Sequence, residues 1–170
     1  MNEQPKLIIF DVDGTLGDPP GTDRSERAKT PARFRKSPDD WQLFPDRKEK
    51  LAELKAQGIK LALATNQGGV AFGYLDKDEM LLWLLDLSFE LGTEGNQVCF
   101  NHPKGTLEQY RKEDYDRKPW PGMLFKAMAF HFALPPDTLY VGDRDEDVMA
   151  AHYAGCGFQH ANEFFGEEIK

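Results

Sequence analysis

Short apolar runs that each stop at a polar or acidic cluster recur along the chain. They are Leu7-Ile8-Ile9-Phe10 before Asp11, Ile59 to Ala64 before Thr65, and Thr138 to Val141 before Gly142-Asp143. Short, partly β-branched runs bounded by loop residues are typical of strands buried on both faces of a sheet. We therefore predict three strands of one buried sheet at these positions.

Helical segments alternate with the predicted strands. One helix follows Asp46 and ends at Gly58, and a second begins at a capping-box-like Asp76 and ends at Gly92. The weaker or later segments are a strand over 97–100, a helix over 105–112, a helix from Pro121 to Phe132, a helix from about 146 to 153 and a strand near 156–158. This alternation predicts an α/β fold, a Rossmann-like parallel sheet with helices on both faces.

The predicted helix over residues 80–91 has an unusual composition, because Met80 to Leu85 are apolar on nearly every side. Such a helix is either deeply buried or covered by a partner. Burial is the simpler expectation in a domain of this size. A homodimer or another protein partner bound through this helix is the alternative.

Residues 17–45 are rich in proline and charge and show no hydrophobic periodicity. They are predicted to form a long loop or small insertion after the first strand, and such loops are often functional. The 170 residues fit one domain, 1–170, in which residues 163–170 are expected to form a tail.

The composition excludes several classes of protein. A formal net charge of −8 disfavours wrapping of nucleic acid, and 40% hydrophobic residues are ordinary for a globular protein. Cys99 and Cys156 form neither a CxxC pair nor a disulfide framework. The polar start of the chain and the lack of a long apolar stretch predict no membrane segment and a cytoplasmic location.

Polar side chains follow the predicted strands, at the edge where open parallel sheets bind ligands. They are Asp11, Asp13, Thr65, Asn66, Asp143, Asp145 and Asp147, with Lys118 in a later loop. So many carboxylates in one pocket need a cation, and an oxygen-only shell suits Mg²⁺. We expect Asp11 to attack phosphorus, Thr65 and Lys118 to hold phosphoryl oxygens, and Asp13 to act as acid and base. Asp145 is expected to be a solvent-facing acid at a helix start.

Four segments resemble, in order, the motifs of haloacid dehalogenase superfamily phosphatases. They are Asp11-Val12-Asp13-Gly14-Thr15, Thr65-Asn66-Gln67, Lys118 in Arg117-Lys118-Pro119, and Gly142-Asp143-Arg144-Asp145-Glu146-Asp147. The resemblance implies a Mg²⁺-dependent phosphoric monoester hydrolase with an aspartyl-phosphate intermediate on Asp11. It implies Asp11, Asp13 and Asp143 as metal ligands, with Asp13 acting through its backbone carbonyl. Thr65, Asn66 and Lys118 would bind phosphate, and Asp147 would be a supporting carboxylate.

A finer resemblance is to subfamily IIIA, which contains histidinol-phosphatases, heptose bisphosphate phosphatases and the phosphatase domains of polynucleotide kinase-phosphatases. It rests on residues 37–45, 65–71 and 117–123 and implies an open site without a large cap domain. Sugar-bisphosphate and histidinol members often bind zinc through Cys-x-His and Cys-x-Cys. The corresponding residues here are Cys99, Asn101, Asp114 and Asp116. One cysteine with carboxylates is a poor Zn²⁺ site, which weakens the transfer of those substrates.

The substrate stays open between a nucleic-acid end and a phosphorylated small molecule. Arg24, Arg27 and Arg33 belong to a basic cluster over 24–36 that either contacts substrate phosphates or is a solvated loop. Trp120 is a further candidate contact, by stacking on a base or sugar. The basic cluster and the missing zinc cysteines favour a nucleic-acid 3′-phosphate or a nucleotide. The alternatives are a sugar or histidinol phosphate and, second, a non-catalytic binding protein of the same fold.

Overall fold

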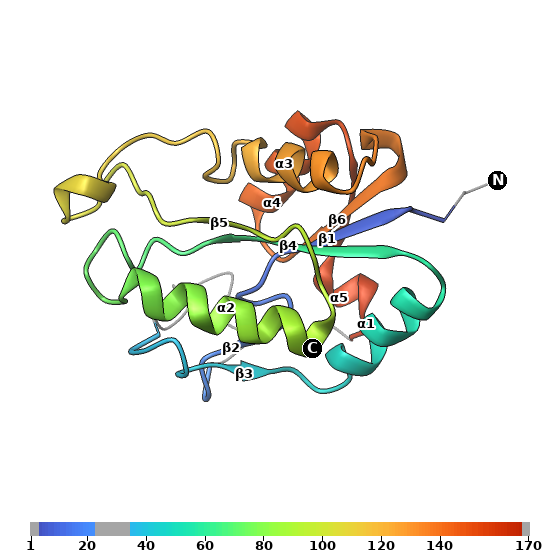
Figure 1. Cartoon of the computed structure of the whole chain (residues 1–170), viewed down its shortest axis with the longest axis horizontal. Helices are drawn as coiled ribbons and strands as arrows, with labels where there is room; N and C mark the ends of the chain where they lie inside the picture. Colours follow the sequence, from blue (N-terminus) through green and yellow to red (C-terminus); the bar gives the residue numbers. More distant parts are fainter. Residues whose placement is uncertain (1–3, 23–34, 168–170) are drawn as a thin grey trace.

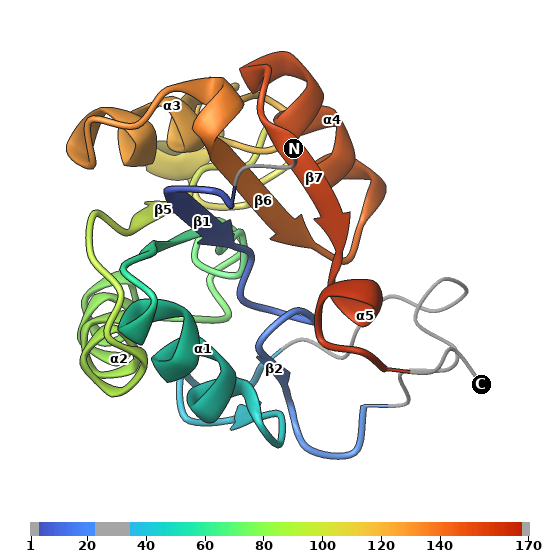
Figure 2. The same cartoon turned by 90° about the vertical axis from the view of Figure 1, so that its right-hand side faces the viewer.

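The computed structural model describes residues 4–22 and 35–167. At its centre is a parallel five-stranded sheet with the strand order β5-β4-β1-β6-β7 (Figure 1 labels the first four strands, and Figure 2 labels β7). The strands are β1 (Leu7–Phe10), β4 (Lys60–Asn66), β5 (Gln97–Cys99), β6 (Thr138–Gly142) and β7 (Gly157–His160). Because Ile9 lies opposite both Ala62 and Tyr140, the three strongest predicted strands are direct neighbours. The predicted fold class is confirmed.

Helices cover both faces of the sheet (Figure 2). On one face lie α1 (Arg47–Ala56), α2 (Lys77–Leu91) and α5 (Ala161–Phe164), and on the other lie α3 (Gly122–Phe130) and α4 (Asp145–Ala154). Leu7 and Ile9 pack with α3 and α4, whereas Ile8 and Phe10 pack with α1 and α2, since neighbouring strand residues point to opposite faces. All four are at most 1% exposed. The unbroken apolar run of β1 is therefore explained by two hydrophobic cores.

Helix α2 starts and ends where the sequence predicts. The Asp76 carboxylate accepts hydrogen bonds from the main-chain N–H groups of residues 78 and 79, and Gly92 ends the helix with a φ of 68°. The prediction that the apolar helix is buried all round is wrong. Met80, Leu84, Leu87 and Leu91 are buried, but Leu81, Leu82, Leu85 and Phe89 are 41%, 64%, 52% and 80% exposed. The fold covers only one side of α2.

One loop prediction and one helix prediction need correction. The described ends of the 17–45 segment pair as a short antiparallel ribbon, β2 (Gly17–Asp18) with β3 (Gln42–Leu43), which alternation cannot reveal in strands this short. Arg24, Arg27 and Arg33 lie outside the described residues. The predicted helix over 105–112 is a single 3₁₀ turn, Glu108–Tyr110, and another 3₁₀ turn, Pro135–Asp137, precedes β6.

The segment expected to begin a tail at residue 163 packs against the core as far as residue 167. The rings of Phe164 and Phe165 lie 5.6 and 6.1 Å from the ring of Phe10. The guanidinium of Arg47 lies 3.7 Å from the ring centre of Phe165 and is bonded to Glu167 (2.8 Å). Hydrophobic periodicity could not predict this aromatic burial, because α5 has only four residues.

Among the helices of residues 4–22 and 35–167, none combines the length and the hydropathy needed to span a bilayer.

Candidate active site

The carboxyl ends of β1, β4 and β6 meet at one edge of the sheet, and the predicted site residues gather there. A pocket of about 360 Å³ opens at this edge. Its lining includes Asp11, Asp13, Asn66, Lys118 and Asp147, with Arg35, Arg117, Arg144, Phe72 and Tyr74 around them. The structure thus brings together residues from all four sequence motifs.

The ammonium group of Lys118 is the centre of the buried polar network. Its Nζ donates hydrogen bonds to Asp11 Oδ1 (2.7 Å), Asp147 Oδ1 (2.7 Å) and the hydroxyl of Tyr140 (2.8 Å). An ammonium group has three N–H donors, so these three acceptors satisfy it completely. Lys118 is 3% exposed, and its charge therefore compensates two carboxylates that are also buried.

Burial and charge act in opposite directions on these groups. Burial alone lowers the pKa of Lys118, but the charges of Asp11 and Asp147 outweigh it and raise that pKa above its ordinary value. Burial raises the pKa of Asp11 well above its ordinary range against the opposing charge of Lys118, and the charges of Asp147 and Asp143 add to the rise. Lys118 compensates Asp11 and Asp147, and the guanidinium of Arg144 adds positive charge beside Asp143.

Asp147 is held from four directions. Its Oδ1 accepts from Lys118 (2.7 Å) and from the hydroxyl of Tyr140 (2.8 Å), and its Oδ2 accepts from the main-chain N–H groups of Asp143 and Arg144 (both 3.1 Å). Gly142 permits this placement, because a Cβ there would lie 2.5 Å from the Cβ of Asp147. Asp147 therefore fixes the loop that carries Asp143.

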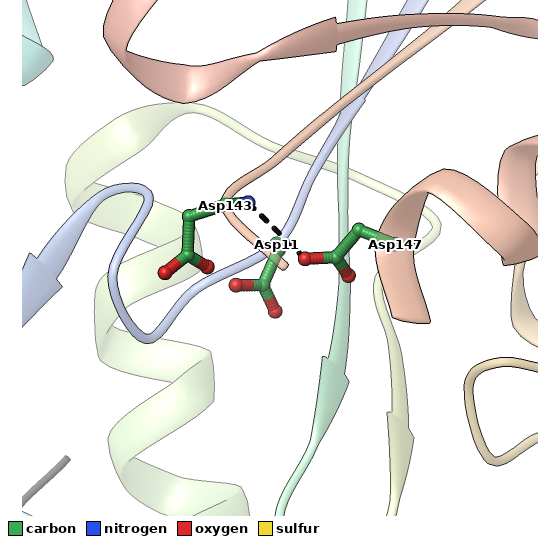
Figure 3. Close-up of side chains that lie close together, drawn as sticks. All are labelled: Asp11, Asp143 and Asp147. Carbon is green, nitrogen blue, oxygen red and sulfur yellow. Dashed lines mark hydrogen bonds between the residues drawn. The ribbon is translucent and has the colours of Figure 1, made fainter. Parts of the chain in front are cut away.

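Figure 3 shows the carboxylates of Asp11, Asp143 and Asp147 converging from the end of β1, the end of β6 and the first turn of α4. One oxygen of each lies within 4.8 Å of the others. Because all four acceptor positions of Asp147 are occupied, Asp11 and Asp143 are the better direct ligands of the three. Hard carboxylate oxygens fit Mg²⁺ rather than a soft metal.

Thr65 and Asn66, both predicted to bind phosphate, are placed differently. Thr65 is fully buried, and its hydroxyl accepts a hydrogen bond from Gln67 Nε2 (2.8 Å). The Asn66 side chain lines the pocket but is bonded to the main chain of Lys118: Nδ2 donates to its carbonyl oxygen and Oδ1 accepts from its N–H, both at 3.1 Å. Asn66 thus fastens the Lys118 loop to the end of β4.

Asp13 is bound by two side chains. Its Oδ1 accepts from Arg35 Nε (3.1 Å) and Nη2 (2.7 Å), and its Oδ2 accepts from Gln67 Nε2 (2.7 Å). The Asp13 carboxylate lies outside the cluster formed by Asp11, Asp143 and Asp147 within the described residues. Arg35 and Gln67 therefore fix the orientation of the Asp13 carboxylate in the pocket wall.

Comparison with known proteins agrees with this geometry. The family described as polynucleotide kinase 3 phosphatase matches residues 6–165. The chain belongs to this family. It is thereby a haloacid dehalogenase superfamily phosphatase, as the four motifs predict, and belongs to subfamily IIIA, as residues 37–45, 65–71 and 117–123 predict.

Curated relatives of the family carry a different name. The D-glycero-beta-D-manno-heptose-1,7-bisphosphate 7-phosphatase of Photorhabdus laumondii is 36% identical over 70% of this chain and 66% of that protein. The Haemophilus ducreyi protein of the same name is 31% identical over 88% of this chain and 79% of that protein. This chain thus spans just under two thirds of the first relative and about four fifths of the second.

A solved structure also matches. It is the D,D-heptose 1,7-bisphosphate phosphatase of B. bronchiseptica, crystallised with magnesium and phosphate. The TM-score is 0.70 at 28% identity, over 90% of this chain and 78% of the other. The parallel sheet and its helices are therefore those of the superfamily.

The loop that in some family members binds zinc is held here by contacts within the protein. The Asn101 side-chain amide donates to Asp114, and Asp116 forms an ion pair with Lys126. Burial raises the pKa of the Cys99 thiol to about 11. Arg117 Nη1 donates to the carbonyl oxygen of Asn101 (3.2 Å), so this loop also positions an arginine of the pocket wall.

The predicted substrate contact of Trp120 is not supported by its position. Trp120 is 47% exposed, is not part of the pocket lining, and stacks between Tyr115 and Tyr153 with ring centres 6.3 and 5.8 Å away. Asp145, expected as a surface acid, is exposed in the first turn of α4.

Sequence reasoning missed Tyr140 and Gln67. Tyr140 is fully buried on β6 with its hydroxyl bonded to both Lys118 and Asp147. A tyrosine in a buried strand usually has a hydrogen-bond partner for its hydroxyl, so the position of Tyr140 in a predicted buried strand could have indicated a polar partner. Gln67 lies inside the quoted Thr65-Asn66-Gln67 motif, but its partners Asp13 and Thr65 emerge only from the fold.

Proposed function

We propose that this chain is a Mg²⁺-dependent phosphatase that hydrolyses a phosphomonoester of a small metabolite through an aspartyl-phosphate on Asp11. The observation that carries the proposal is the convergence of Asp11, Lys118 and Asp143 at the open end of the sheet. Packing alone gives no reason to gather these charges, since burial of Asp11 and Lys118 carries a desolvation cost.

Asp11 is the nucleophile. Its Oδ1 is held by Lys118, while the contact of its Oδ2 within the described part of the chain is a long one, with the hydroxyl of Thr15 (3.4 Å). In the first step an oxygen of Asp11 forms a bond to phosphorus as the bond to the leaving oxygen breaks. Lys118, beside this centre, stabilises the negative charge on the phosphoryl oxygens.

Mg²⁺ would be held by the carboxylates of Asp11 and Asp143 and by the backbone carbonyl of Asp13, with Asp147 as the supporting carboxylate. When bound, it supplies the positive charge that lets an anionic phosphate approach the Asp11 carboxylate. Asp147 keeps Asp143 in place through the main-chain N–H group at 3.1 Å.

Asp13 is the general acid and base. Its carboxyl proton passes to the leaving-group oxygen as the first bond to phosphorus breaks. In the second step the Asp13 carboxylate takes a proton from water, whose oxygen attacks phosphorus and releases Asp11. The Asp13 carboxylate lines the same pocket as Asp11 and has its own partners, Arg35 and Gln67, which supports this division of roles.

The substrate we favour is a sugar phosphate with a second anionic group. The curated relatives compared above are both named heptose bisphosphate phosphatases. A pocket of about 360 Å³ suits a ligand of the size of a sugar bisphosphate, and Arg117 and Arg144 in its lining suit a second phosphate. This is the alternative of the sequence analysis, which gave first place to a nucleic-acid end.

A nucleic-acid 3′-phosphate stays as the second candidate, because the matching family is described as polynucleotide kinase 3 phosphatase. The arginines that favour it in the sequence, Arg24, Arg27 and Arg33, belong to the segment that the structure does not describe. The small pocket and the net charge of −8 weigh against it.

A substrate comparison tests this choice. Heptose 1,7-bisphosphate, histidinol phosphate and a 3′-phosphorylated oligonucleotide are compared by kcat/KM under the same Mg²⁺ concentration. We expect the sugar bisphosphate to exceed the oligonucleotide by at least about tenfold, because a contact with a second anion in the pocket is worth one or two kcal/mol. An oligonucleotide that is the better substrate would reverse the order of the two candidates.

Mg²⁺ is expected to stabilise the folded protein through Asp143. At saturating Mg²⁺ the free energy of unfolding should rise by about 1–3 kcal/mol, as for any ligand that binds only the folded state. In Asp143→Asn most of this rise should be lost, whereas Asp145→Asn, which alters an exposed acid two residues away, should keep it. Urea unfolding with and without Mg²⁺ measures both, and an equal rise in the two variants would remove Asp143 from the metal site.

A further inference from the structure

The insertion between β2 and β3 contributes a buried arginine to the active site. Arg35 is 6% exposed, lines the pocket, and directs its guanidinium at Asp13. Its Nε and Nη2 both donate to Asp13 Oδ1, at 3.1 and 2.7 Å. Its Nη1 donates to the carbonyl oxygen of Pro38 (3.2 Å), so three of its nitrogens are engaged.

Two tryptophans hold Arg35 in this position. The guanidinium carbon lies 3.9 Å from the ring centre of Trp83 on α2 and 5.3 Å from that of Trp41. The two rings pack edge to face, with centres 5.0 Å apart. A guanidinium on an aromatic face gains a cation–π attraction and loses mobility. Arg35 is thus fixed by Trp83, Trp41 and Pro38 as well as by Asp13.

The other side of Asp13 is fixed by Gln67. One N–H of Gln67 Nε2 donates to Asp13 Oδ2 (2.7 Å) and the other to the hydroxyl of Thr65 (2.8 Å), so both donors of the amide are used. Among the described residues, Asp13 Oδ1 accepts two hydrogen bonds and Oδ2 accepts one. Oδ2 is therefore the oxygen with room for a proton.

We propose that Arg35 is a positioning residue for Asp13, holding Oδ1 so that Oδ2 is the atom that delivers and receives the proton. The inference rests on the proposed function of Asp13 as general acid and base. In the first step the proton on Oδ2 passes to the leaving oxygen while phosphorus is transferred to Asp11. In the second step Oδ2 takes a proton from water as the water oxygen bonds to phosphorus. Arg35 stays bonded to Oδ1 throughout and touches neither substrate nor phosphorus.

A pair of substrates separates this role from others. An alkyl phosphate needs its leaving oxygen protonated, whereas p-nitrophenolate leaves without a proton, so only the first depends on the acid. The quantity compared is kcat/KM, which reports the steps up to release of the alcohol and excludes the later attack by water. The variant is Arg35→Met, which keeps an apolar stem between the tryptophans and removes every donor.

We expect Arg35→Met to lower kcat/KM for an alkyl phosphate by about 10- to 100-fold, part of the general-acid contribution, and for p-nitrophenyl phosphate by less than about threefold. Across a series of aryl and alkyl phosphates, kcat/KM of Arg35→Met should fall more steeply with rising pKa of the leaving group than kcat/KM of the parent does. Arg111→Met, which removes an exposed arginine far along the chain, should leave kcat/KM unchanged for both substrates.

Several outcomes would overturn the proposal. Equal losses for both substrates would indicate that Arg35 binds phosphate or only supports the fold, and unchanged values for both would show that it has no role. Arg35→Lys keeps the charge without the two-point contact and should show the same selective loss at smaller size. It replaces the methionine variant if that variant does not fold. A parent protein that hydrolyses neither substrate would refute the proposed phosphatase function itself. Failure of that function is thereby distinguished from failure of the proposal for Arg35.

Discussion

Replacing Asp11 with asparagine is expected to lower kcat by a factor on the order of 10⁴ or more, while the protein stays folded. The amide is a far weaker nucleophile than the carboxylate and cannot form a stable acyl phosphate. Its carbonyl oxygen can still accept the hydrogen bond that Lys118 now donates to Asp11 Oδ1 at 2.7 Å. The geometry around Lys118 should therefore survive the substitution.

Initial rates with saturating substrate and Mg²⁺ measure this loss, and circular dichroism with thermal melting checks the fold. Asp145→Asn makes the same chemical change at an exposed helix start and should retain at least half of the parent activity. Asp11→Asn with activity near that of this control would remove Asp11 from the role of nucleophile.

Replacing Lys118 with methionine should abolish activity and also destabilise the protein by about 3–5 kcal/mol. The lysine compensates Asp11 and Asp147, which are 6% and 1% exposed, and its removal leaves two buried carboxylates without their common counter-ion. Mg²⁺ should recover part of the lost stability, because a cation at Asp11 and Asp143 reduces the same repulsion.

Urea unfolding of the parent and of Lys118→Met, each in EDTA and in Mg²⁺, gives the four free energies of unfolding that this prediction compares. Lys126→Met is the matched control, since Lys126 is paired with Asp116 on the surface and its side chain is 56% exposed. An ion pair of that kind contributes at most about 1 kcal/mol. A Lys118→Met protein as stable as this control would contradict the central position of Lys118 in the charge balance.

The core of the site could be predicted because it depends on chain order. Asp11, Asn66 and Asp143 each end a strand or follow one directly, and parallel strands present their carboxyl ends at one edge. Once β1, β4 and β6 are identified as strands, the meeting of these residues follows. Lys118 required the resemblance to the family, because it stands in a loop that has no periodicity of its own.

What could not be predicted depends on contacts between distant segments. Asp147 is visible in the sequence as an acid, but the saturation of its oxygens by Lys118, Tyr140 and two main-chain N–H groups follows only from the fold. Arg35 is one cation of a basic cluster in the sequence, and its burial follows from Trp83 on α2. Residue type indicates what a group can do, and tertiary packing decides which partner it meets.

The same limit explains the errors at the surface. The leucines of α2 are alike in sequence, yet Leu84 and Leu87 are buried while Leu82 and Leu85 are exposed. A uniformly apolar helix contains no internal signal of which side is covered. The aromatic pair Phe164 and Phe165 likewise joins the core through contacts with Phe10 and Arg47, which lie far away along the chain.

The most direct test of the proposed chemistry is to trap the phosphoryl group on the protein. The enzyme is mixed with substrate and Mg²⁺, quenched in acid within one turnover, and reduced with borohydride, which converts an aspartyl phosphate to homoserine. Peptide mass spectrometry then locates the change. Modification at residue 11 in the parent, with none in Asp11→Asn, is the predicted result. Phosphate release in the same mixture with no modified residue, or with the modification elsewhere, would contradict the assignment of Asp11 as the covalent nucleophile.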